Sequence, residues 1–422
     1  MTRVYYSLYD RMLSMGNLER AFKKVKASKG AAGIDGQSIG DFDQAREMHL
    51  SKLFYELKTK QYRPKPVKRV EIPKPDGGVR QLGIPSVRDR VVQQALREIL
   101  EPIFDPGFHP SSYGYRPGRS CHHAITKSQM FIREYGLKWV VDMDLSKCFD
   151  TLDHEIIIKS VKKRVTDGSI LNLIRMFLTS GVMEDGNWKA STEGSPQGGV
   201  ISPLIANIYI DAFDQFMMNR GHRIVRYADD ILILKRTRSA AENACDQASR
   251  YLEGELKLTV NPTKTHIVHS SKGVKFLGVV IHSGFTRIQD KKVKAFKDKV
   301  RKITRRTSPV NLETIIRQLN PVCRGFANYF RIANCNKVFE GLSQWIRRRL
   351  RAKQLKLWKT PSRLHRRLRQ LGYKGEFAFI KMNSWRNSAS PLASYSLPNK
   401  YFEDQGLFDV AHVNTGITVS FN

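Results

Sequence analysis

Apolar residues along this chain follow a helical spacing in some stretches and a strand-like alternation in others. Helical spacing dominates the first 60 residues, in "LERAFKKVKAS" and "REMHLSKLFYELKTK", which a Gly-rich loop joins. It returns after residue 290 in "VKAFKDKVRKI", "LETIIRQLNPVCRGFANYF" and "VFEGLSQWIRRRLRAKQLKLW", which predict three or more amphipathic basic helices. We therefore expect a mixed region of helices and strands up to about 285–290 and an all-helical basic module after it.

Three stretches between these helical regions have the short runs of β-strands. In "RPKPVKRVEIPKPDGGVRQLGIP", Pro residues and a Gly-Gly pair bracket runs that predict a hairpin with an exposed basic tip. In "KWVVDMDL", alternation puts Val140, Asp142 and Asp144 on one face of a strand. A regular strand would send Asp229 and Asp230 of "IVRYADDILIL" to opposite faces, so a tight turn at 228–230 is needed to bring both acids to one site.

The excess of basic residues indicates a polyanionic partner. The chain has 422 residues, enough for roughly two to four domains, and carries 72 Lys and Arg against 39 Asp and Glu, a net charge of +33. Residues 291–370 alone hold 24 basic residues against three acids. Nucleic acid is the first expectation and a membrane surface the second. The membrane is the weaker one, because no apolar run approaches the roughly 18 to 20 residues of a spanning helix and the N-terminus lacks a signal-peptide core.

Cysteine and histidine form no metal or disulfide pattern in the sequence. The five cysteines are odd in number and include no CxxC pair, which is typical of reduced thiols in the cytoplasm. His122 and His123 beside Cys121 have no later partner at ligand spacing and fit a helix face better. Residues 381–422 are polar with few periodic runs, so they form either a small module or a partly ordered tail.

The acids stand out because they interrupt apolar strands in a strongly basic chain. The Asp229–Asp230 pair alone is most simply a polar turn, but Asp144 at the end of a second strand favours a cation site. Close carboxylates repel each other, which raises a pKa unless a cation binds between them. Mg²⁺ prefers oxygen ligands, and two such ions can activate a hydroxyl and stabilise a leaving oxygen in phosphoryl transfer. Asp150 and Asp153 fit helix caps better than ligands.

These motifs resemble the palm motifs of reverse transcriptases, and specifically those of the group II intron-encoded proteins. In that family an aromatic residue follows the catalytic aspartate by five positions, as Phe149 follows Asp144, and a Tyr-Ala-Asp-Asp motif matches 227–230. "GSPQGGVISP" matches the Gln-Gly-x-x-x-Ser-Pro motif at 197–203. The similarity continues in order through "PKPDGGVRQLGIP", "SYGYRPGRS", "NPTKT" and "FLG", over nearly the whole chain.

The resemblance implies an α+β, right-hand polymerase fold, with fingers and an antiparallel palm sheet followed by an all-α basic thumb and maturase domain. The implied domains are an N-terminal extension at 1–60, reverse transcriptase fingers and palm at 61–285, a thumb and maturase X domain at 286–380, and a DNA-binding-like tail at 381–422. Many relatives end in an HNH endonuclease with paired cysteines and histidines. No cysteine follows Cys335, so we expect a bacterial lineage without this domain, and no DNA cleavage.

The implied function is RNA-directed DNA synthesis for a group II intron by two-metal nucleotidyl transfer, with binding of the intron RNA to assist splicing and retrohoming. Two Mg²⁺ ions are the implied cofactor, with Mn²⁺ as a substitute. The implied partners are an RNA template with a DNA or RNA primer, deoxynucleoside triphosphates, intron RNA and target DNA, in the bacterial cytoplasm with the nucleoid or an RNP. Two alternatives stay open: a domesticated enzyme of DNA repair, defence or CRISPR acquisition, and a non-catalytic RNA-binding splicing cofactor, which would not need a metal triad.

Residue by residue, the resemblance assigns the chemistry to three aspartates. Asp144, Asp229 and Asp230 are the implied catalytic acids, and the implied metal ligands are Asp144, Asp229 and the carbonyl of Leu145. The implied nucleotide contacts are Lys74, Arg80, Phe149 and Gln197, with Phe149 as a gate against a ribose 2′-OH. Lys264 is the candidate general acid for pyrophosphate. From the residues alone, a solvated basic hairpin, core packing of Phe149 and a solvated loop lysine remain alternatives.

Nucleic-acid contacts are implied on both sides of the predicted domain boundary. The implied template and primer contacts are Arg63, Tyr113, Arg116, Arg119, Phe276, Leu277 and Gly278. The implied RNA or duplex contacts are Arg347, Arg348, Arg349 and Arg351.

Overall fold

Side-chain caps fix where several of the main helices begin. The computed structural model describes residues 3–73, 77–184, 187–190, 193–194, 198–374 and 385–420. Ser14, Ser86 and Ser120 accept backbone N–H groups at the starts of α2 (Met15–Ala27), α5 (Val87–Phe104) and α6 (Cys121–Arg133). Asp153 caps α7 (His154–Lys162), which confirms its predicted role. The chain folds into two compact units, Met1–His269 and Ser270–Asn422.

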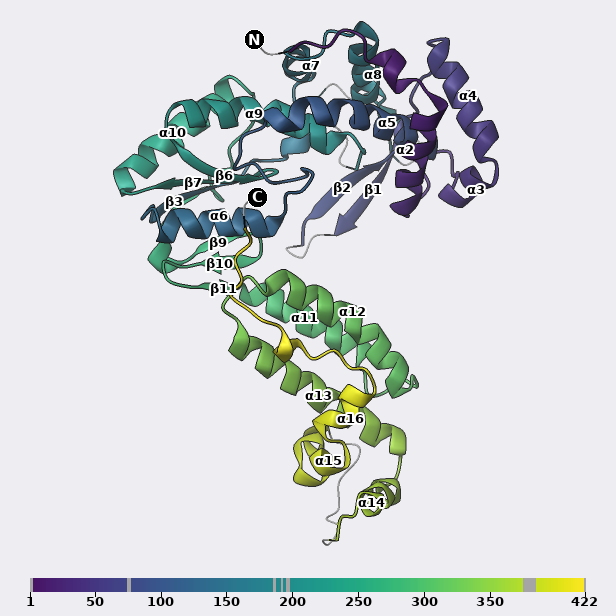
Figure 1. Ribbon diagram of the computed structural model, residues 1–422, viewed down its shortest axis with the longest axis vertical. Coiled ribbons are helices and arrows are strands. Elements are labelled where there is room, and N and C mark those ends of the chain that lie inside the picture. Colours follow the sequence, from purple (N-terminus) through teal and green to yellow (C-terminus); the bar gives the residue numbers. More distant parts are fainter. Residues whose placement is uncertain are drawn as a thin grey trace. The chain divides into compact units, whose positions relative to one another are not determined.

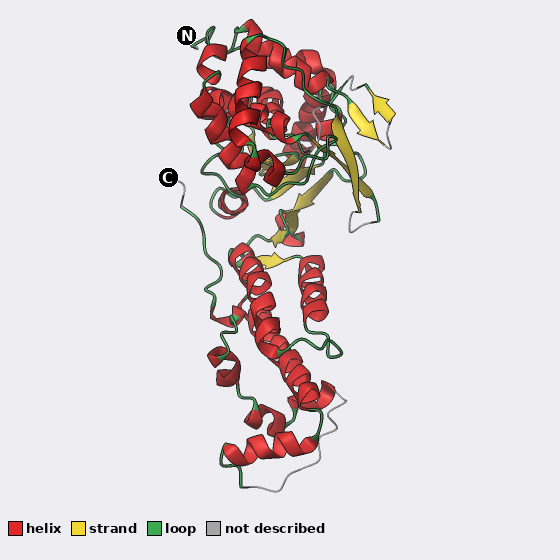
Figure 2. Cartoon of the chain, turned by 90° about the vertical axis from the view of Figure 1, so that its right-hand side faces the viewer, coloured by secondary structure: helices red, strands yellow, loops and turns green. Residues whose placement is uncertain are grey.

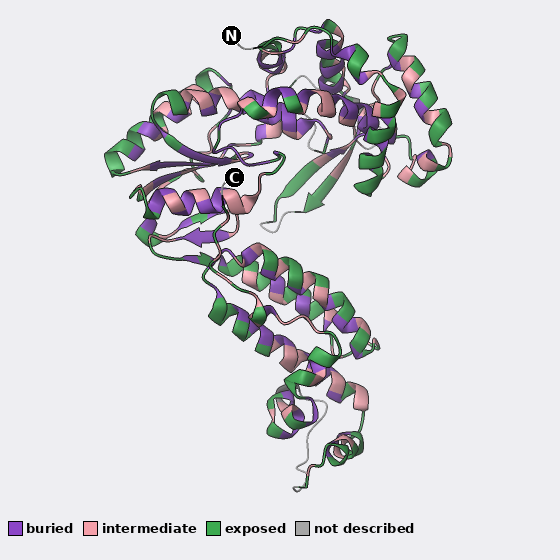
Figure 3. Cartoon of the chain, viewed as in Figure 1, coloured by how far each residue is buried: buried purple, intermediate pink, exposed green. Residues whose placement is uncertain are grey.

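The first unit is built around one apolar core (Figure 3). The predicted N-terminal helices are present as α2 and as the helix at Arg46–Lys58. Phe22, Leu96, Ile174 and Phe213 are each at most 2% exposed, so helices far apart in sequence share this core. The other α-helices of this unit are α1 (Tyr9–Met12), α3 (Ile39–Gln44), α4 (Arg46–Lys58), α8 (Gly168–Thr179), α9 (Ser202–Asn219) and α10 (Arg238–Gly254).

The predicted basic hairpin belongs to a four-stranded sheet with the order β2-β1-β4-β5. Strands β1 (Val67–Pro73) and β2 (Val79–Ile84) pair antiparallel, and both become exposed toward their tip. Strand β4 (Val182–Glu184) pairs parallel with β1 and antiparallel with β5 (Asn187–Lys189). Among the described residues of the hairpin, Lys68 and Arg80 are exposed, which leaves these basic side chains available to an anionic ligand.

The second sheet of this unit has the order β6-β7-β3-β8, with antiparallel neighbours throughout. Its strands are β3 (Trp139–Met143), β6 (Arg223–Tyr227), β7 (Asp230–Lys235) and β8 (His266–His269). Helices α9 and α10 pack against it (Figure 1). Val140, Val141 and all of 231–234 are fully buried, because the middle of the sheet is covered on both faces. The acidic motifs are therefore confined toward one end of β3 and β7.

The second unit starts with a small sheet and continues as helices (Figure 2). Strands β9 (Val274–Phe276), β10 (Val279–Ile281) and β11 (Thr286–Ile288) form an antiparallel sheet in the order β11-β10-β9. As predicted, the described residues after 288 contain helices and no strand. These helices are α11 (Asp290–Ile303), α12 (Leu312–Phe330), α13 (Asn336–Trp358), α14 (Pro361–Gln370), α15 (Pro391–Ser396) and α16 (Asn399–Asp404).

The division between the units lies at 269/270, earlier than the predicted domain boundary at 285/286. Strands β9 to β11 pack with the helices that follow them. The Tyr329 hydroxyl donates to the carbonyl of Leu277 at 2.8 Å, and the Thr286 N–H donates to Asn334 Oδ1 at 2.9 Å. Among the described helices, none is long and apolar enough to cross a membrane.

The end of the chain returns along α12 and α13. The Phe408 N–H donates to Asn320 Oδ1 at 2.9 Å, and the Gly416 N–H donates to the carbonyl of Ala333 at 2.9 Å. Of the two expectations for 381–422, the described part, 385–420, fits a packed module better than a loose tail. Its DNA-binding role stays a prediction.

Candidate active site

Strand pairing brings the two acidic motifs together. Met143 of β3 lies opposite Ile231 of β7, so the next positions, Asp144 and Asp230, lie at the same end of the pair. Asp142 faces Leu232 in the same register, which places Asp142, Asp144 and Asp230 on one face. The predicted convergence of Asp144 with the second motif is therefore present in the fold.

A two-residue turn carries the third acid. Tyr227 pairs with Asp230, which leaves Ala228 and Asp229 as the turn between β6 and β7. Ala228 adopts a φ of 58°, a left-handed value that residues with a Cβ rarely take. The tight turn predicted from the sequence is confirmed, and it takes Asp229 out of the strand alternation.

The charges of these acids act on one another. Burial, followed by repulsion from Asp229, Asp142 and Asp144, raises the pKa of Asp230 to about 7, although its side chain still reaches solvent. Burial and the Asp144 charge also raise the pKa of Asp229, while Arg80 and Arg226 partly offset this. Such crowding favours a bound cation, and carboxylate oxygens suit Mg²⁺.

The residues present fit a magnesium site that substrate oxygens would complete. Across the described residues, no group of three or more His, Cys, Asp and Glu side chains is arranged as a ready metal site. Mg²⁺ commonly takes one or two carboxylates and fills its remaining positions with water and phosphate oxygens. Leu145, the predicted carbonyl ligand, is buried next to Asp144 and forms a β-bridge with Val260.

Lys264 lies beside the acids, as its predicted role requires. Its Nζ is 3.6 Å from a carboxylate oxygen of Asp144, and its side chain is 64% exposed. The loop that carries it is anchored to the same strand end, because the Asn261 N–H donates to the carbonyl of Asp144 at 2.8 Å and the Ser146 N–H donates to Thr259 at 2.9 Å. The lysine is thus held near the site yet accessible to a ligand.

The predicted nucleotide contacts divide into described and undescribed residues. Phe149 is partly buried against the core, and its ring meets the edge of Tyr115 at 6.4 Å between centroids. Arg80 on β2 is exposed and lies close enough that its charge partly offsets the rise that burial causes in the pKa of both Asp229 and Tyr115. Lys74 and Gln197 lie outside the described residues.

Comparison with known proteins agrees with this geometry. A model described as "Reverse transcriptase (RNA-dependent DNA polymerase)" matches residues 72–281, and one described as "Group II intron, maturase-specific domain" matches residues 293–372. Protein YkfC of Escherichia coli (strain K12) is 37% identical over 300 residues, which cover 62% of this chain and 79% of YkfC.

The chain belongs to the group II intron-encoded reverse transcriptase family. The group II intron-encoded protein LtrA of Lactococcus lactis subsp. cremoris is 29% identical, over 65% of this chain and 56% of LtrA, so this chain spans little more than half of that relative. A solved apo telomerase from Candida tropicalis matches with a TM-score of 0.43 and 15% identity, over 56% of this chain and 59% of the telomerase.

In this member of the family, the predicted template loop is partly buried. Tyr113 is 1% exposed and Arg116 is 8% exposed. The Arg116 guanidinium donates to Asp105 at 2.7 Å and to the carbonyls of His109 and Ser112. Burial is inconsistent with the prediction that these two side chains contact the template directly; they shape the loop instead.

Of the other predicted template contacts in the first unit, Arg63 is exposed and Arg119 is partly exposed. Arg119 donates to the carbonyl of Pro110 at 2.9 Å, and its guanidinium lies over the Tyr113 ring. Arg63 donates to the carbonyls of Lys60 and Tyr62. Template contact stays a prediction for Arg63 and Arg119.

The predicted primer-grip residues form a tight turn in the second unit. Leu277 and Gly278 connect β9 and β10 with φ values of 45° and 83°. Phe276 is 3% exposed, so its side chain belongs to the core and leaves the turn backbone as the accessible part. The primer role stays a prediction.

Three of the four arginines predicted to bind RNA make internal contacts. Arg347 donates to Asp409 at 2.7 Å, Arg349 donates to Thr304 Oγ1 at 2.6 Å, and Arg351 donates to the carbonyl of Leu397 at 2.8 Å. These contacts tie α13 to the loop after α11 and to the returning chain end. They correct the expectation that all four guanidinium groups are available to RNA; for Arg348 the prediction stands untested.

A buried polar cluster that was not predicted from the sequence lies under the Ala228–Asp229 turn. Arg226 and Asp214 are both 0% exposed and form an ion pair at 2.6 Å. Two signals pointed to it: a charged residue inside the apolar run "IVRY", and polar residues Asn207, Asp211 and Asp214 at helical spacing in the apolar helix α9.

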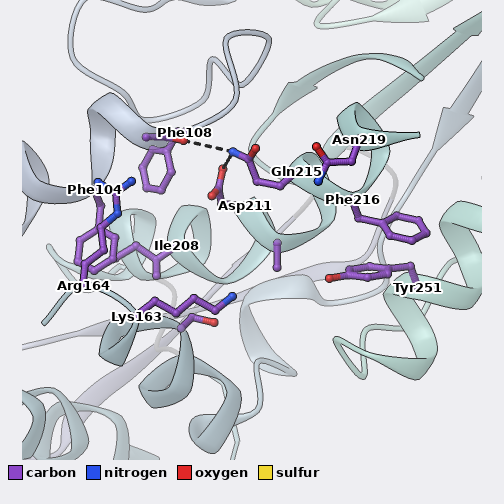
Figure 4. A pocket seen from close by; sticks show the side chains of 13 residues that line it. Phe104, Phe108, Lys163, Arg164, Ile208, Asp211, Gln215, Phe216, Asn219 and Tyr251 are labelled. Carbon is purple, nitrogen blue, oxygen red and sulfur yellow. Dashed lines mark hydrogen bonds between the residues drawn. The ribbon is translucent and has the colours of Figure 1, made fainter. Parts of the chain in front are cut away.

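A cavity of about 760 Å³ lies elsewhere in the first unit, among α5, α7, α9 and α10 (Figure 4). Asp211, Gln215, Lys163 and Tyr251 contribute to its lining. Burial and the neighbouring Asp214 raise the pKa of Asp211 to about 6. Among the described residues, none of the predicted catalytic or nucleotide-binding side chains lines this cavity, so it is separate from Asp144, Asp229 and Asp230.

Proposed function

We propose that this protein is an active RNA-directed DNA polymerase that copies an RNA template by nucleotidyl transfer at Asp144, Asp229 and Asp230. The observation that carries the proposal is the pairing of β3 with β7, which sets Asp144 beside Asp230 and next to the turn that bears Asp229. A protein that only bound RNA would gain nothing from three mutually repelling carboxylates. Burial, together with this repulsion, raises the pKa of Asp230 to about 7.

Each residue has a defined task in this mechanism. Asp144 and Asp229 would hold the divalent cations, which when bound activate the primer hydroxyl and stabilise the leaving oxygen. Arg80 lies near the acids and supplies positive charge toward the triphosphate. Lys264, 3.6 Å from Asp144, is placed to give a proton to departing pyrophosphate. Phe149 is the gate that leaves no room for a ribose 2′-OH.

The second unit supports a role in binding group II intron RNA. Its match to the maturase-specific domain covers 293–372, and 291–370 holds 24 basic residues against three acids. Neutralising RNA phosphates would relieve the self-repulsion of that charge. We therefore propose that the same chain assists splicing and retrohoming of its intron. DNA repair, defence and CRISPR acquisition remain alternative settings for the same chemistry, and nothing in the fold favours them.

A template-primer extension assay with Mg²⁺ tests the polymerase proposal. The wild type should synthesise DNA on an RNA template, and Asp229→Ala should lower the rate by more than about 100-fold, since even outer partners of a metal site contribute 10- to 100-fold. RNA binding by Asp229→Ala, measured in parallel, should stay near the wild-type level. No DNA synthesis by the wild type, or full synthesis by Asp229→Ala, would contradict the proposal.

A further inference from the structure

Arg226 is a fully buried cation two residues before the turn that carries Asp229. Its Nε donates to both carboxylate oxygens of Asp214 at 2.9 Å, and its Nη2 donates to Asp214 Oδ2 at 2.6 Å. Asp214 comes from α9, which packs against the sheet that contains β6 and β7 (Figure 1). The pair therefore fixes a strand end to a long helix inside the core.

The remaining donors of Arg226 reach the turn and its surroundings. Nη2 donates to Ser112 Oγ at 2.8 Å, while Nη1 donates to Asn207 Oδ1 and to the carbonyl of Ala228, both at 3.0 Å. All five N–H groups of the guanidinium thus have acceptors. One of these acceptors is the turn residue that directly precedes Asp229.

The turn is also confined from its other side. A Cβ at Gly114 would lie 2.3 Å from the backbone nitrogen of Ala228, so the two chain segments are in direct backbone contact. The side chain of Asn207 donates through Nδ2 to the carbonyl of Gly114 at 2.9 Å, and its Oδ1 accepts from Arg226. Asn207 therefore links the Gly114 segment to Arg226, and both of these contact the turn.

A buried ion pair of this kind is a weak contributor to stability. Replacing such a pair with apolar residues of similar volume is often neutral or stabilising, because removing two charges from water is costly. The arrangement makes sense if it specifies geometry, since the strained left-handed backbone of Ala228 persists only where surrounding contacts hold it.

We propose that Arg226, held by Asp214 and Asn207, is a positioning residue that fixes the Ala228–Asp229 turn and thereby sets how tightly the acidic site holds a divalent cation. This inference rests on the proposed function for the cation itself. The fixing of the turn by Arg226 is independent of catalysis.

The main test replaces the ion pair without leaving a lone buried charge. In the full-length double variant Arg226→Met with Asp214→Leu, we expect the melting temperature to stay close to that of the wild type. Binding of Mn²⁺, followed by electron paramagnetic resonance, should weaken by about 10- to 100-fold. Amide hydrogen exchange at 228–230 should accelerate, because the turn loses its fixed partner.

A control removes a different, partly buried ion pair of the same unit. Arg88 and Glu56 form a 2.6 Å pair whose side chains are 22% and 18% exposed. Arg88→Met with Glu56→Leu should leave both Mn²⁺ binding and exchange at 228–230 unchanged. An equal loss of Mn²⁺ affinity in this control would show a general destabilisation and overturn the inference.

Arg226→Lys keeps the inference testable if the double variant does not fold. The lysine keeps a charge next to Asp214 but lacks the forked donors, so Mn²⁺ binding should weaken and exchange at 228–230 should still accelerate. Wild-type exchange and Mn²⁺ affinity in a folded Arg226→Lys or double variant would refute the proposal. If the wild type binds no Mn²⁺, the proposed function fails, and the exchange measurement alone still decides whether Arg226 holds the turn.

Discussion

At the scale of single residues, Asp230 has a higher pKa than a free aspartate. Burial and its acidic neighbours raise its pKa from 3.8 to about 7. Between these values the unfolded chain releases the proton while the folded protein keeps it. Without a cation, this residue therefore costs stability as the pH rises from about 4 to about 7, and the cost is constant above that range.

Asp230→Asn should remove this cost. In the presence of EDTA, the variant should melt at a higher temperature than the wild type at pH 8, and the difference should shrink as the pH falls toward 4. Thermal unfolding across this pH range measures the effect. The exposed Asp404→Asn is the control and should show no such trend. A difference between Asp230→Asn and wild type that does not depend on pH would argue against the crowded site.

Phe149→Val tests the gate at the same scale. The smaller side chain should raise incorporation of ribonucleotides relative to deoxynucleotides by about tenfold or more, because the ring no longer collides with the 2′-OH. Single-nucleotide extension with each substrate measures the ratio. Phe54→Val, which also alters a partly buried ring on the same core, should leave the ratio unchanged. Unchanged discrimination in Phe149→Val would assign the ring to packing alone.

The individual residues also show where motif reading succeeds and fails. Asp144, Asp229 and Asp230 were identified because these acidic residues interrupt apolar runs. Tyr113 and Arg116 were expected on the surface, yet they are buried, since a loop with tyrosines and arginines looks the same in sequence whether it faces a ligand or the core. Arg226 escaped notice because the side chains it pairs with lie 12 to 114 positions away in the chain.

At the scale of elements, side chains of α13 bind the end of the chain within the second unit. Arg347 and Asp409 form an ion pair with side chains that are 13% and 9% exposed, and Ser343 donates to the same carboxylate. Amphipathic spacing predicted this helix. It could not predict that the chain end returns to cover one side of it, because that contact joins positions more than 60 residues apart.

Arg347→Ala should destabilise the second unit by about 3 kcal/mol, because it leaves the Asp409 carboxylate buried without its cation. Denaturant unfolding measures this change. Lys356→Ala removes one positive charge from an exposed position on the same helix and should leave stability unchanged. If Arg347→Ala is as stable as Lys356→Ala but loses far more RNA affinity, Arg347 contacts RNA directly.

At the scale of the whole molecule, the charge of +33 predicts strongly salt-dependent RNA binding. Each neutralised phosphate should lower log K by roughly 0.7 to 0.9 for a tenfold rise in salt, so six contacts would produce a slope of about −4 to −5. Filter binding or fluorescence anisotropy with the full chain measures the slope. Asp229→Ala should bind with the wild-type slope, and binding that is insensitive to salt would contradict an electrostatic interface.

Short-range patterns were enough to predict the N-terminal helices, the β1–β2 hairpin, the acidic motifs and the basic helices after residue 290, and to suggest a chemistry for the acids. Alternation and helical spacing depend on neighbours within a few residues, and the acid motifs and net charge are properties of composition. Tertiary structure decided which acids meet, which arginines face inward and what supports the Asp229 turn. Those outcomes depend on strand register and on contacts between distant segments, such as β3 with β7 and Arg226 with Asp214, which no local pattern encodes.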